Sequence, residues 1–395
     1  MWGFKKRIYL DYASATPVLP KAASSMEDAA SAFANPGGLH AESVVAKRVL
    51  EHSRDKIAAH LGCKARELIF TSGLTEANNL GIVGAARALE RTRRTLKGTD
   101  WIVSSIEHSS VLECFAEVER MGGKVTHVEP EPSGIIPAEK IAALLRPETV
   151  FVSVGWGNNE IGTIQPLSTI ARILREHERK HLSTSSGQAR HIIFHSDAGQ
   201  APLYRSPQVH TLGVDILALG SGKLYGPRGI GALYISNKVS LLPVMFGGGQ
   251  ERGLRSGTED VALAAGFAEA LDIITRERES ESKRLQKLRD DFARKIVAHV
   301  PDVVINGDLR HALPHMLNVS IPGDKTGEYL ALQLDHAGIA LSTKSACNEG
   351  QQSSHVVEAL GVEGWRAKNT LRFSLGRETT ARDIARTLKA LIQLS

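Results

Sequence analysis

Four residues that could act together on one cofactor follow short apolar runs in this sequence. Thr75 opens a helical pattern after ELIFTSG, His108 follows DWIVSSIE, and Asp197 ends HIIFHSD. Lys223 follows VDILALGSG. A helix start can hold a phosphate, and a lysine amine can form a Schiff base with an aldehyde. An aspartate can pair with a protonated ring nitrogen, and a histidine can stack on a ring or transfer a proton.

Taken singly, each of these residues has a more ordinary interpretation. Thr75 is typical of a helix N-cap, Asp197 of a turn, and Lys223 of a surface loop. His108 alone would be a capping or surface histidine. Together, in this order and each at a strand end, the four residues indicate a site for pyridoxal 5′-phosphate (PLP). The glycine-rich stretch GSGKLYGPRG lets the backbone around Lys223 approach such a cofactor closely.

The elements that must position these residues alternate along the first two thirds of the chain. Short β-rich runs are separated by longer helical patterns, such as LTEANNLGIVGAARALERTRR and PLSTIARILREHERKH. This alternation predicts an α/β fold with a mostly parallel, seven-stranded sheet, whose ligands bind at the carboxyl ends of the strands. From about residue 262 a long charged helical pattern precedes short strands and helices. We therefore predict a large PLP-binding domain over residues 15–261, and a small α+β domain made of residues 1–14 and 262–395.

The composition argues against several classes of protein. The 395 residues carry a net charge of +5, and the basic residues are spread along the chain, which disfavours nucleic-acid binding. No apolar stretch approaches the roughly 20 residues that span a bilayer, and the N-terminus does not resemble a signal peptide. Cys63, Cys114 and Cys347 form no CxxC motif, which disfavours a disulfide scaffold or a cysteine zinc site. We expect a cytoplasmic protein that binds no metal, nucleic acid or membrane.

Several longer motifs make the sequence similar to one family over nearly its whole length. From IYLDYASATP to LRFSLGR, the chain resembles the cysteine desulfurases of the class V aminotransferase family, which are PLP enzymes of fold type I. The similarity is nearer to the long-loop type of these enzymes. The motifs that carry it are TSGLTEANN, EHSSVLE, NNEIGTIQP, DAGQ, KLYGPRGIGALY, GGGQERGLRSGT and SACNEG.

The resemblance implies roles in PLP binding for residues of these motifs. Lys223 would bond to the cofactor aldehyde, Asp197 would hold the pyridine nitrogen, and His108 would stack on the ring and take part in catalysis. Further residues implied in cofactor binding are Gly73, Leu74, Thr75, Asn159, Gln200 and Ser221, and Thr258 would reach the phosphate of the other subunit. The resemblance therefore implies a homodimer with shared active sites.

The resemblance also implies the substrate and the reaction. Asn35 and Arg372 would hold the carboxylate of L-cysteine, and a guanidinium suits this task because it can donate two parallel hydrogen bonds. The thiolate of Cys347 would take the substrate sulfur as a persulfide and release L-alanine. The surrounding SACNEGQQSS is small and polar, which is typical of a mobile loop. Cys63 and Cys114 flank apolar helical positions and fit buried structural thiols.

Glycines replace three residues of the family pattern. Gly222 stands where the family has a histidine, Gly199 where it has a threonine, and Gly220 where it has a serine, with Ser221 one residue later.

The main expectation is a cysteine desulfurase that supplies sulfur to an acceptor protein in iron–sulfur cluster assembly, thio-cofactor synthesis or tRNA thiolation. Two other functions stay open. One is a selenocysteine lyase, which uses nearly the same residues. The other is a catalytically weak PLP-binding partner in sulfur transfer, which Gly222 favours. A transaminase or carbon–carbon lyase is disfavoured because neither needs a loop cysteine.

Overall fold

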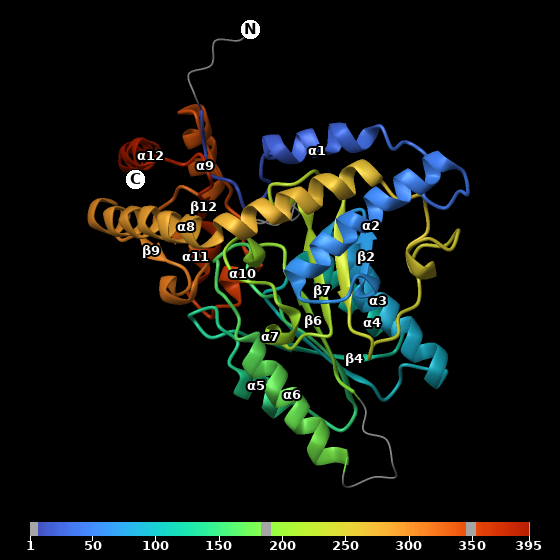
Figure 1. Cartoon of the computed structure of the whole chain (residues 1–395). Helices are drawn as coiled ribbons and strands as arrows, with labels where there is room; N and C mark the ends of the chain where they lie inside the picture. The colour runs from blue at the N-terminus through green and yellow to red at the C-terminus, as the bar shows by residue number, and fades with distance from the viewer. Residues whose placement is uncertain (1–6, 183–190, 345–352, 395) are drawn as a thin grey trace.

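A seven-stranded sheet forms the centre of the molecule (Figure 1). The computed structural model describes residues 7–182, 191–344 and 353–394. In spatial order the strands of this sheet are β2 (Leu68–Thr71), β8 (Gly231–Ile235), β7 (Ile216–Gly220), β6 (Ile193–Asp197), β5 (Thr149–Ser153), β3 (Asp100–Ser104) and β4 (Lys124–Val128). β8 runs antiparallel to β2 and β7, and the other neighbouring pairs are parallel. The expected α/β fold with a mostly parallel sheet is confirmed.

Helices cover both faces of this sheet, which is why most of its strands are continuous apolar runs. On one face, α3 (Leu74–Arg93) and α4 (Ser109–Arg120) enclose a core that includes Trp101 and Phe115. The helices that pack on the opposite face are α2 (Ala41–Leu61), α5 (Ala138–Leu144), α6 (Leu167–Leu182), α7 (Val209–Leu212) and α8 (Val261–His299). Among the residues described, no helix combines the length and the apolar character that a membrane span requires.

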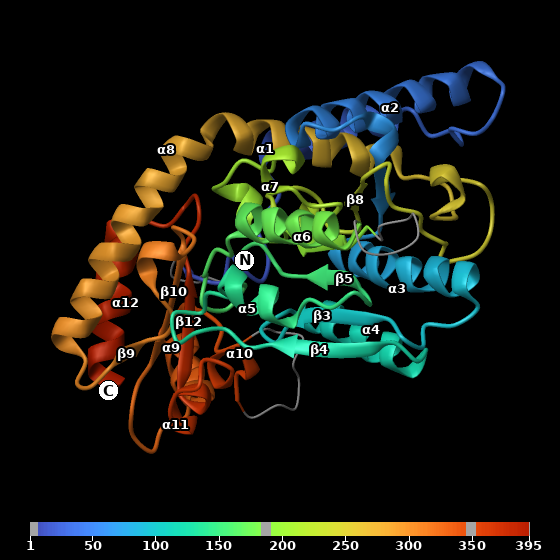
Figure 2. The same ribbon diagram turned by 90° about the horizontal axis from the view of Figure 1, so that it is seen from below.

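α8 joins the central sheet to a second, smaller group of elements (Figure 2). It packs along α1 (Pro20–Ala30) and α2, and its other end reaches α12 (Ala381–Leu394). There, β12 (Thr370–Ser374), β10 (Met316–Ser320) and β9 (Val304–Ile305) form an antiparallel sheet. The remaining elements of this group are α9 (Gly327–His336), β11 (Ile339–Ala340), α10 (His355–Glu358), α11 (Gly364–Lys368) and β1 (Ile8–Tyr9), which pairs with β11. One core cluster runs through both parts, and the domain boundaries drawn from the sequence stay a prediction.

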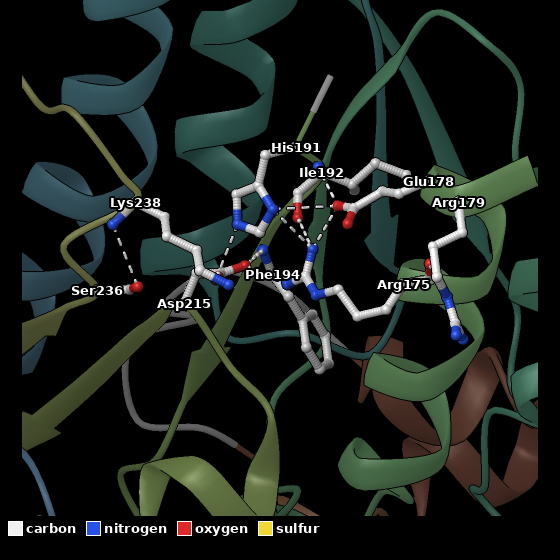
Figure 3. A network of polar contacts seen from close by, with 9 residues as sticks. All are labelled: Arg175, Glu178, Arg179, His191, Ile192, Phe194, Asp215, Ser236 and Lys238. Atoms are coloured by element: carbon white, nitrogen blue, oxygen red, sulfur yellow. Dashed lines mark hydrogen bonds and ion pairs between the residues drawn. The ribbon is translucent and has the colours of Figure 1, made fainter. Parts of the chain in front are cut away.

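A cluster of charged side chains fixes the amino-terminal end of β6 (Figure 3). Asp215 accepts a hydrogen bond of 2.5 Å from Arg175 Nη2 and one of 2.9 Å from the backbone N–H of Phe194, on β6. His191 lies between two carboxylates, with Nε2 2.9 Å from Asp215 Oδ1 and Nδ1 3.2 Å from Glu178 Oε1. Burial lowers the pKa of His191, but the hydrogen bonds to the two carboxylates outweigh it and raise this pKa above its ordinary value. The cluster therefore holds the start of the strand whose other end enters the candidate site.

Candidate active site

The carboxyl ends of the central strands border a cavity of about 190 Å³. β6 ends there at Asp197, β7 leads into the turn that bears Lys223, and His108 is the N-cap of α4 after β3. The residues singled out from the sequence that line this cavity are Leu74, Thr75, His108, Asn159, Asp197, Gln200, Lys223 and Arg372. Most of these side chains meet there because the parallel strands of the central sheet end at the same edge, and β12 of the second sheet brings Arg372 to the same place.

A chain of hydrogen bonds orients the carboxylate of Asp197 in the cavity. Asn78 Nδ2 donates to Asp197 Oδ2 over 2.7 Å and to Ser110 Oγ over 2.9 Å. The backbone N–H of Gly199 donates to the other carboxylate oxygen over 2.8 Å. Ser110 Oγ in turn lies 2.9 Å from Nδ1 of His108. One buried network therefore fixes both the aspartate and the histidine before any ligand binds.

The same network determines which ring nitrogen of His108 carries the proton. Its Nδ1 accepts a hydrogen bond of 3.1 Å from the backbone N–H of Ser110, which assigns the ring proton of the neutral form to Nε2. Burial is the main reason why the pKa of His108 lies below its ordinary value. At neutral pH the ring is therefore an uncharged imidazole, which can stack on an aromatic ring and donate the Nε2 proton.

Two residues near the N-terminus hold the amine of Lys223. Its Nζ donates to the carbonyl oxygens of Ala13 and Ser14, both over 2.8 Å. Gln200 Nε2 donates to the same carbonyl of Ala13, also over 2.8 Å. Gln200 Oε1 is buried and has no hydrogen-bond partner within the described parts of the chain. This unpartnered acceptor suits a ligand that brings a hydroxyl group, because leaving it unpaired costs free energy.

Arg372 lies on β12 and brings a buried guanidinium to the cavity. Its Nη1 donates to the carbonyl oxygen of Asn159 over 2.9 Å. Its Nη2 donates to Asp11 Oδ1 over 2.8 Å and to Ser14 Oγ over 2.6 Å. Its Nε is buried and has no partner among the described residues. Both N–H groups of Nη2 are thus engaged, so a carboxylate can pair with the edge formed by Nε and Nη2 only by displacing one of these partners.

The start of α3 supplies the part of the cavity suited to an anion. Leu74 and Thr75 are the first two residues of this helix of 20 residues, and Gly73 is its N-cap. Backbone N–H groups in the first turn of a helix lack partners within the helix and favour negative charge. The hydroxyl of Thr75 adds a side-chain donor at the same place. These groups are those that a phosphate requires.

The packing of Leu74 explains two of the glycines that depart from the family pattern. A Cβ atom at Gly199 would lie 2.6 Å from Leu74 Cδ2, and one at Gly220 would lie 3.0 Å from Leu74 Cβ. A Cβ atom at Gly222 would lie 3.2 Å from Cγ of Arg228. Leu74 and Arg228 therefore occupy the space that larger residues would need. The wall beside α3 is apolar where the family pattern has hydroxyl groups.

Asn35, Ser221 and Thr258 do not line this cavity. Asn35 is exposed between α1 and α2, and its Oδ1 accepts a hydrogen bond of 2.9 Å from the N–H of Gly37. Ser221 is buried, with Oγ so close to Gly226 that a Cβ atom there would lie 2.1 Å from it. Thr258 is exposed and borders a separate cavity of about 120 Å³. Within one chain none of the three borders the cavity, although Ser221 lies in the same short turn as Lys223.

Sequence reasoning missed two residues of the candidate site, Glu107 in the cavity wall and Asn78 behind it. Asn78 follows Thr75 by three positions, and this spacing, which places both on one face of a helix, was the available signal. Glu107 precedes His108 and lines the cavity, with Oε1 accepting a hydrogen bond of 2.7 Å from the N–H of Gly155. Burial is the main cause that raises the pKa of Glu107 to about 8. This carboxyl is therefore largely protonated at neutral pH.

The described residues on either side of segment 345–352 lie against the cavity wall. The backbone N–H of Arg372 donates to the carbonyl oxygen of Ser342 over 2.6 Å, within an isolated antiparallel bridge. On the other side, Nε2 of His355 lies 3.0 Å from the carbonyl oxygen of Glu107. The chain therefore enters and leaves this segment beside residues of the candidate site.

The described thiols are poor nucleophiles. Burial is the main cause that raises the pKa of both Cys63 and Cys114 to about 12, so both are protonated at neutral pH. Cys114 Sγ also donates to the carbonyl oxygen of Ser110 over 3.1 Å. Cys347 lies outside the described residues. Within the described ranges, no group of three or more His, Cys, Asp or Glu side chains is suited to hold a metal ion.

The residues of the cavity fit PLP. An amine, a carboxylate held by two donors, a neutral histidine and a helix start are what its aldehyde, ring nitrogen, ring and phosphate require. The unpartnered acceptor on Gln200 suits its ring hydroxyl. On this sheet, such a set of groups defines a PLP-dependent enzyme of fold type I.

The chain belongs to the class-V aminotransferase family, whose model matches residues 8–387. The cysteine desulfurase IscS of Dictyoglomus turgidum is 36% identical to it over 389 residues, which cover 98% of this chain and 94% of that protein. A solved structure of a NifS-like protein superposes with a TM-score of 0.88 at 30% identity, covering 98% of this chain and 99% of the other. A structure of SspA in complex with cysteine gives a TM-score of 0.79 at 33% identity, covering 93% of this chain and 98% of that one. The resemblance to cysteine desulfurases is confirmed.

Proposed function

We propose that this chain is a cysteine desulfurase that converts L-cysteine to L-alanine and transfers the sulfur to Cys347. The observation that carries the proposal is the meeting of Lys223, Asp197 and Arg372 in one cavity, where an amine and a buried guanidinium face the space left for an amino acid. The names of its relatives support the same reaction, and one related structure, that of SspA, was solved with cysteine.

The cofactor would be held by groups that the structure already orients. Lys223 Nζ would bond to the aldehyde of PLP and Asp197 would face its ring nitrogen. Thr75 and the first N–H groups of α3 would hold the phosphate. When bound, PLP supplies an electron sink that makes the Cα proton of the amino acid acidic. Because Asn78 and Gly199 already donate to the Asp197 carboxylate, that group needs little reorganisation at the moment of reaction.

Arg372 would hold the substrate through the edge formed by Nε and Nη2. The carboxylate of L-cysteine would accept from both nitrogens, so that Nη2 gives up its hydrogen bond to Ser14 Oγ. This grip fixes the Cα atom relative to Lys223 Nζ, which takes the Cα proton. His108, with its proton on Nε2, would act as the proton donor in the formation of alanine.

The sulfur step would use the thiolate of Cys347. This thiolate attacks the sulfur of the substrate, an S–S bond forms, and the bond between sulfur and the β-carbon breaks. A proton delivered to the β-carbon and the return of a proton to Cα complete L-alanine, and Cys347 is left as a persulfide. The residues that flank segment 345–352 support this role, because Ser342 and His355 bond to Arg372 and Glu107 of the cavity wall.

A homodimer would complete the site. Asn35 and Thr258 are exposed and lie outside the cavity of their own chain, so they are available to a second copy. Phe33 and Leu39, near Asn35, are 83% and 98% exposed, and Phe246 is 70% exposed. Large exposed apolar side chains of this kind favour association. In this dimer Thr258 would reach the phosphate bound by its partner.

The persulfide of Cys347 would pass to an acceptor protein, for iron–sulfur cluster assembly, thio-cofactor synthesis or tRNA thiolation. A thiol that must be free to react suits the reducing cytoplasm. The proposal of a cytoplasmic location rests on the reactivity of the Cys347 thiol.

The release of alanine by the purified protein tests the proposal. The protein is supplied with PLP and a thiol reductant, and L-cysteine and L-selenocysteine are compared as substrates. We expect alanine from L-cysteine. Release from L-selenocysteine alone would indicate a selenocysteine lyase. No release from either substrate, with normal visible absorption of the bound cofactor, would indicate a weak PLP-binding partner in sulfur transfer.

A further inference from the structure

Glu76 connects two segments that are far apart in the sequence. Its Oε2 accepts a hydrogen bond of 2.6 Å from the backbone N–H of Ser72, in the turn that opens α3. Its Oε1 accepts one of 3.0 Å from Arg255 Nε. The side chains of Glu76 and Arg255 are only 11% and 21% exposed, so solvent screens this ion pair less than an ordinary surface pair. One carboxylate therefore ties the turn proposed to hold the phosphate to the segment around Arg255.

A second carboxylate makes a parallel connection. Glu251 is buried and accepts hydrogen bonds of 2.6 and 2.8 Å from Arg54. It also accepts one of 2.8 Å from the backbone N–H of Phe70, on β2, just before the same turn. Glu251 and Arg252 have φ values of 47° and 60°, which residues with a side chain seldom adopt. Such a conformation persists only where surrounding contacts hold it, and the bonds of Glu251 are contacts of this kind.

The segment held in this way ends at Thr258, three residues after Arg255. Thr258 is exposed and does not line the cavity of its own chain. In the proposed dimer it reaches the phosphate held by the partner subunit. The turn proposed to hold a subunit's own phosphate and the segment that leads to Thr258 are therefore bonded to the same carboxylate.

We propose that Glu76 is a positioning residue for both phosphate sites of the dimer. It holds the turn at residues 72–75 for the cofactor of its own subunit, and through Arg255 it holds Thr258 for the cofactor of the partner. Glu76 is absent from the cavity lining, so its effect passes through these two segments. The proposal rests on the proposed PLP-binding function.

The test is the affinity of the cofactor-free protein for PLP and for pyridoxal, which lacks the phosphate. Both are titrated into the wild type, Glu76→Gln and Arg255→Lys, and binding is followed by visible absorption. We expect Glu76→Gln to raise the Kd for PLP about tenfold to a hundredfold, the range that follows from losing hydrogen bonds to a charged group. The Kd for pyridoxal should stay unchanged. Arg255→Lys keeps the positive charge, so we expect its Kd for PLP to rise less than that of Glu76→Gln.

Two further variants control the result. Glu279→Gln removes an exposed carboxylate that pairs with Lys283 on α8, and it should leave both affinities unchanged. Glu76→Gln combined with Arg255→Gln should bind PLP as Glu76→Gln does, since either change alone breaks the pair.

The outcomes separate this inference from the proposed function. If the wild type does not bind PLP, the proposed function fails. If the wild type binds PLP and Glu76→Gln binds it equally well, the positioning role is wrong. Equal weakening of PLP and pyridoxal would also overturn the inference, because the effect would then not pass through the phosphate. A Glu76→Gln protein that does not fold leaves Arg255→Lys against Arg255→Gln as the decisive pair, and equal PLP affinities there would contradict the proposal.

Discussion

Lys223 and Gln200 donate hydrogen bonds to the same carbonyl oxygen, that of Ala13, each over 2.8 Å. The next residue, Ser14, accepts from Lys223 through its carbonyl oxygen and from Arg372 through its hydroxyl. A short stretch near the N-terminus therefore orients the amine proposed to bond to the cofactor and the guanidinium proposed to bind the substrate. It does so across the boundary between the central sheet and β12.

Replacement of Lys223 tests the proposed attachment of the cofactor. Lys223→Ala removes the amine, and we expect the visible absorption of the lysine-bound cofactor to disappear because no Schiff base with the protein can form. The spectrum of protein mixed with PLP is the measurement. Lys238→Ala, which removes an exposed lysine, is the control and should keep the wild-type spectrum. An unchanged spectrum in Lys223→Ala would show that another group holds the aldehyde.

Replacement of Asn78 tests the network that orients Asp197. Asn78→Ala removes the donor to Asp197 Oδ2 and to Ser110 Oγ. We expect the free energy of unfolding to fall by about 1.5–3 kcal/mol, which is typical for a hydrogen bond to a charged group, and cofactor affinity to fall with it. Urea unfolding and PLP titration measure the two effects. Asn79→Ala, whose amide donates to a backbone carbonyl of its own helix, should keep wild-type affinity. If Asn78→Ala and Asn79→Ala lose the same PLP affinity, Asn78 has no special role in orienting Asp197.

A pair of variants tests the packing of Leu74 against Gly220. Gly220 has φ −129°, so a side chain meets no backbone strain there, and any cost of Gly220→Ser comes from the contact with Leu74. We expect this variant to lose about 1–3 kcal/mol of stability, as overpacked sites do. Adding Leu74→Gly, which removes the Cβ atom that the new side chain meets, should restore part of the loss and allow the new hydroxyl to raise PLP affinity. If the two changes are simply additive, Leu74 is not what excludes a serine.

The buried carboxyl of Glu107 predicts a particular pH dependence. Burial raises its pKa to about 8, whereas in the unfolded chain it ionises near the ordinary value of about 4.3. Between these values the unfolded state has lost the proton and the folded state has kept it. The Glu107 contribution to stability therefore falls as pH rises, by up to about 1.4 kcal/mol for each pH unit, and levels off above the folded pKa.

Glu107→Gln keeps a neutral polar group at this position and should remove that contribution. The measurement is the free energy of unfolding in urea at several pH values from about 5 to about 9. Relative to the variant, the wild type should lose stability across this window. Glu113→Gln, on the exposed side of α4, should run parallel to the wild type. A difference between wild type and Glu107→Gln that does not change with pH would mean that Glu107 is ionised in the folded state.

The fold followed from local patterns because its elements are strongly periodic. The strand before Lys223 is apolar along its length, the strand that ends at Asp197 begins with apolar residues, and the helices between such strands show one apolar face. The strand-end rule then brought these residues together correctly. The antiparallel direction of β8 was not predicted, because a strand's direction depends on the path of its connection and not on its own residues.

Local patterns predicted the site residues that follow strand ends, whereas Asn159 and Arg372 were expected only from the family resemblance. Ala13 and Ser14 reach Lys223 across 210 and 209 positions, and no local pattern records such a contact. Ser221 lies only two residues before Lys223, yet its hydroxyl lies against Gly226, because the short helical turn after β7 rotates it away from the cavity. Side-chain direction in a turn depends on backbone angles that spacing alone does not define.

The central claim is that Cys347 takes the sulfur of L-cysteine. The most direct measurement is mass spectrometry of the protein after reaction with L-cysteine, comparing the wild type with Cys347→Ala, Cys63→Ala and Cys114→Ala. The account predicts one added sulfur on the peptide that contains Cys347 and release of alanine. Cys63→Ala and Cys114→Ala should retain both, and Cys347→Ala should lose both. Persulfide on Cys63 or Cys114, or alanine released by Cys347→Ala at the wild-type rate, would contradict it.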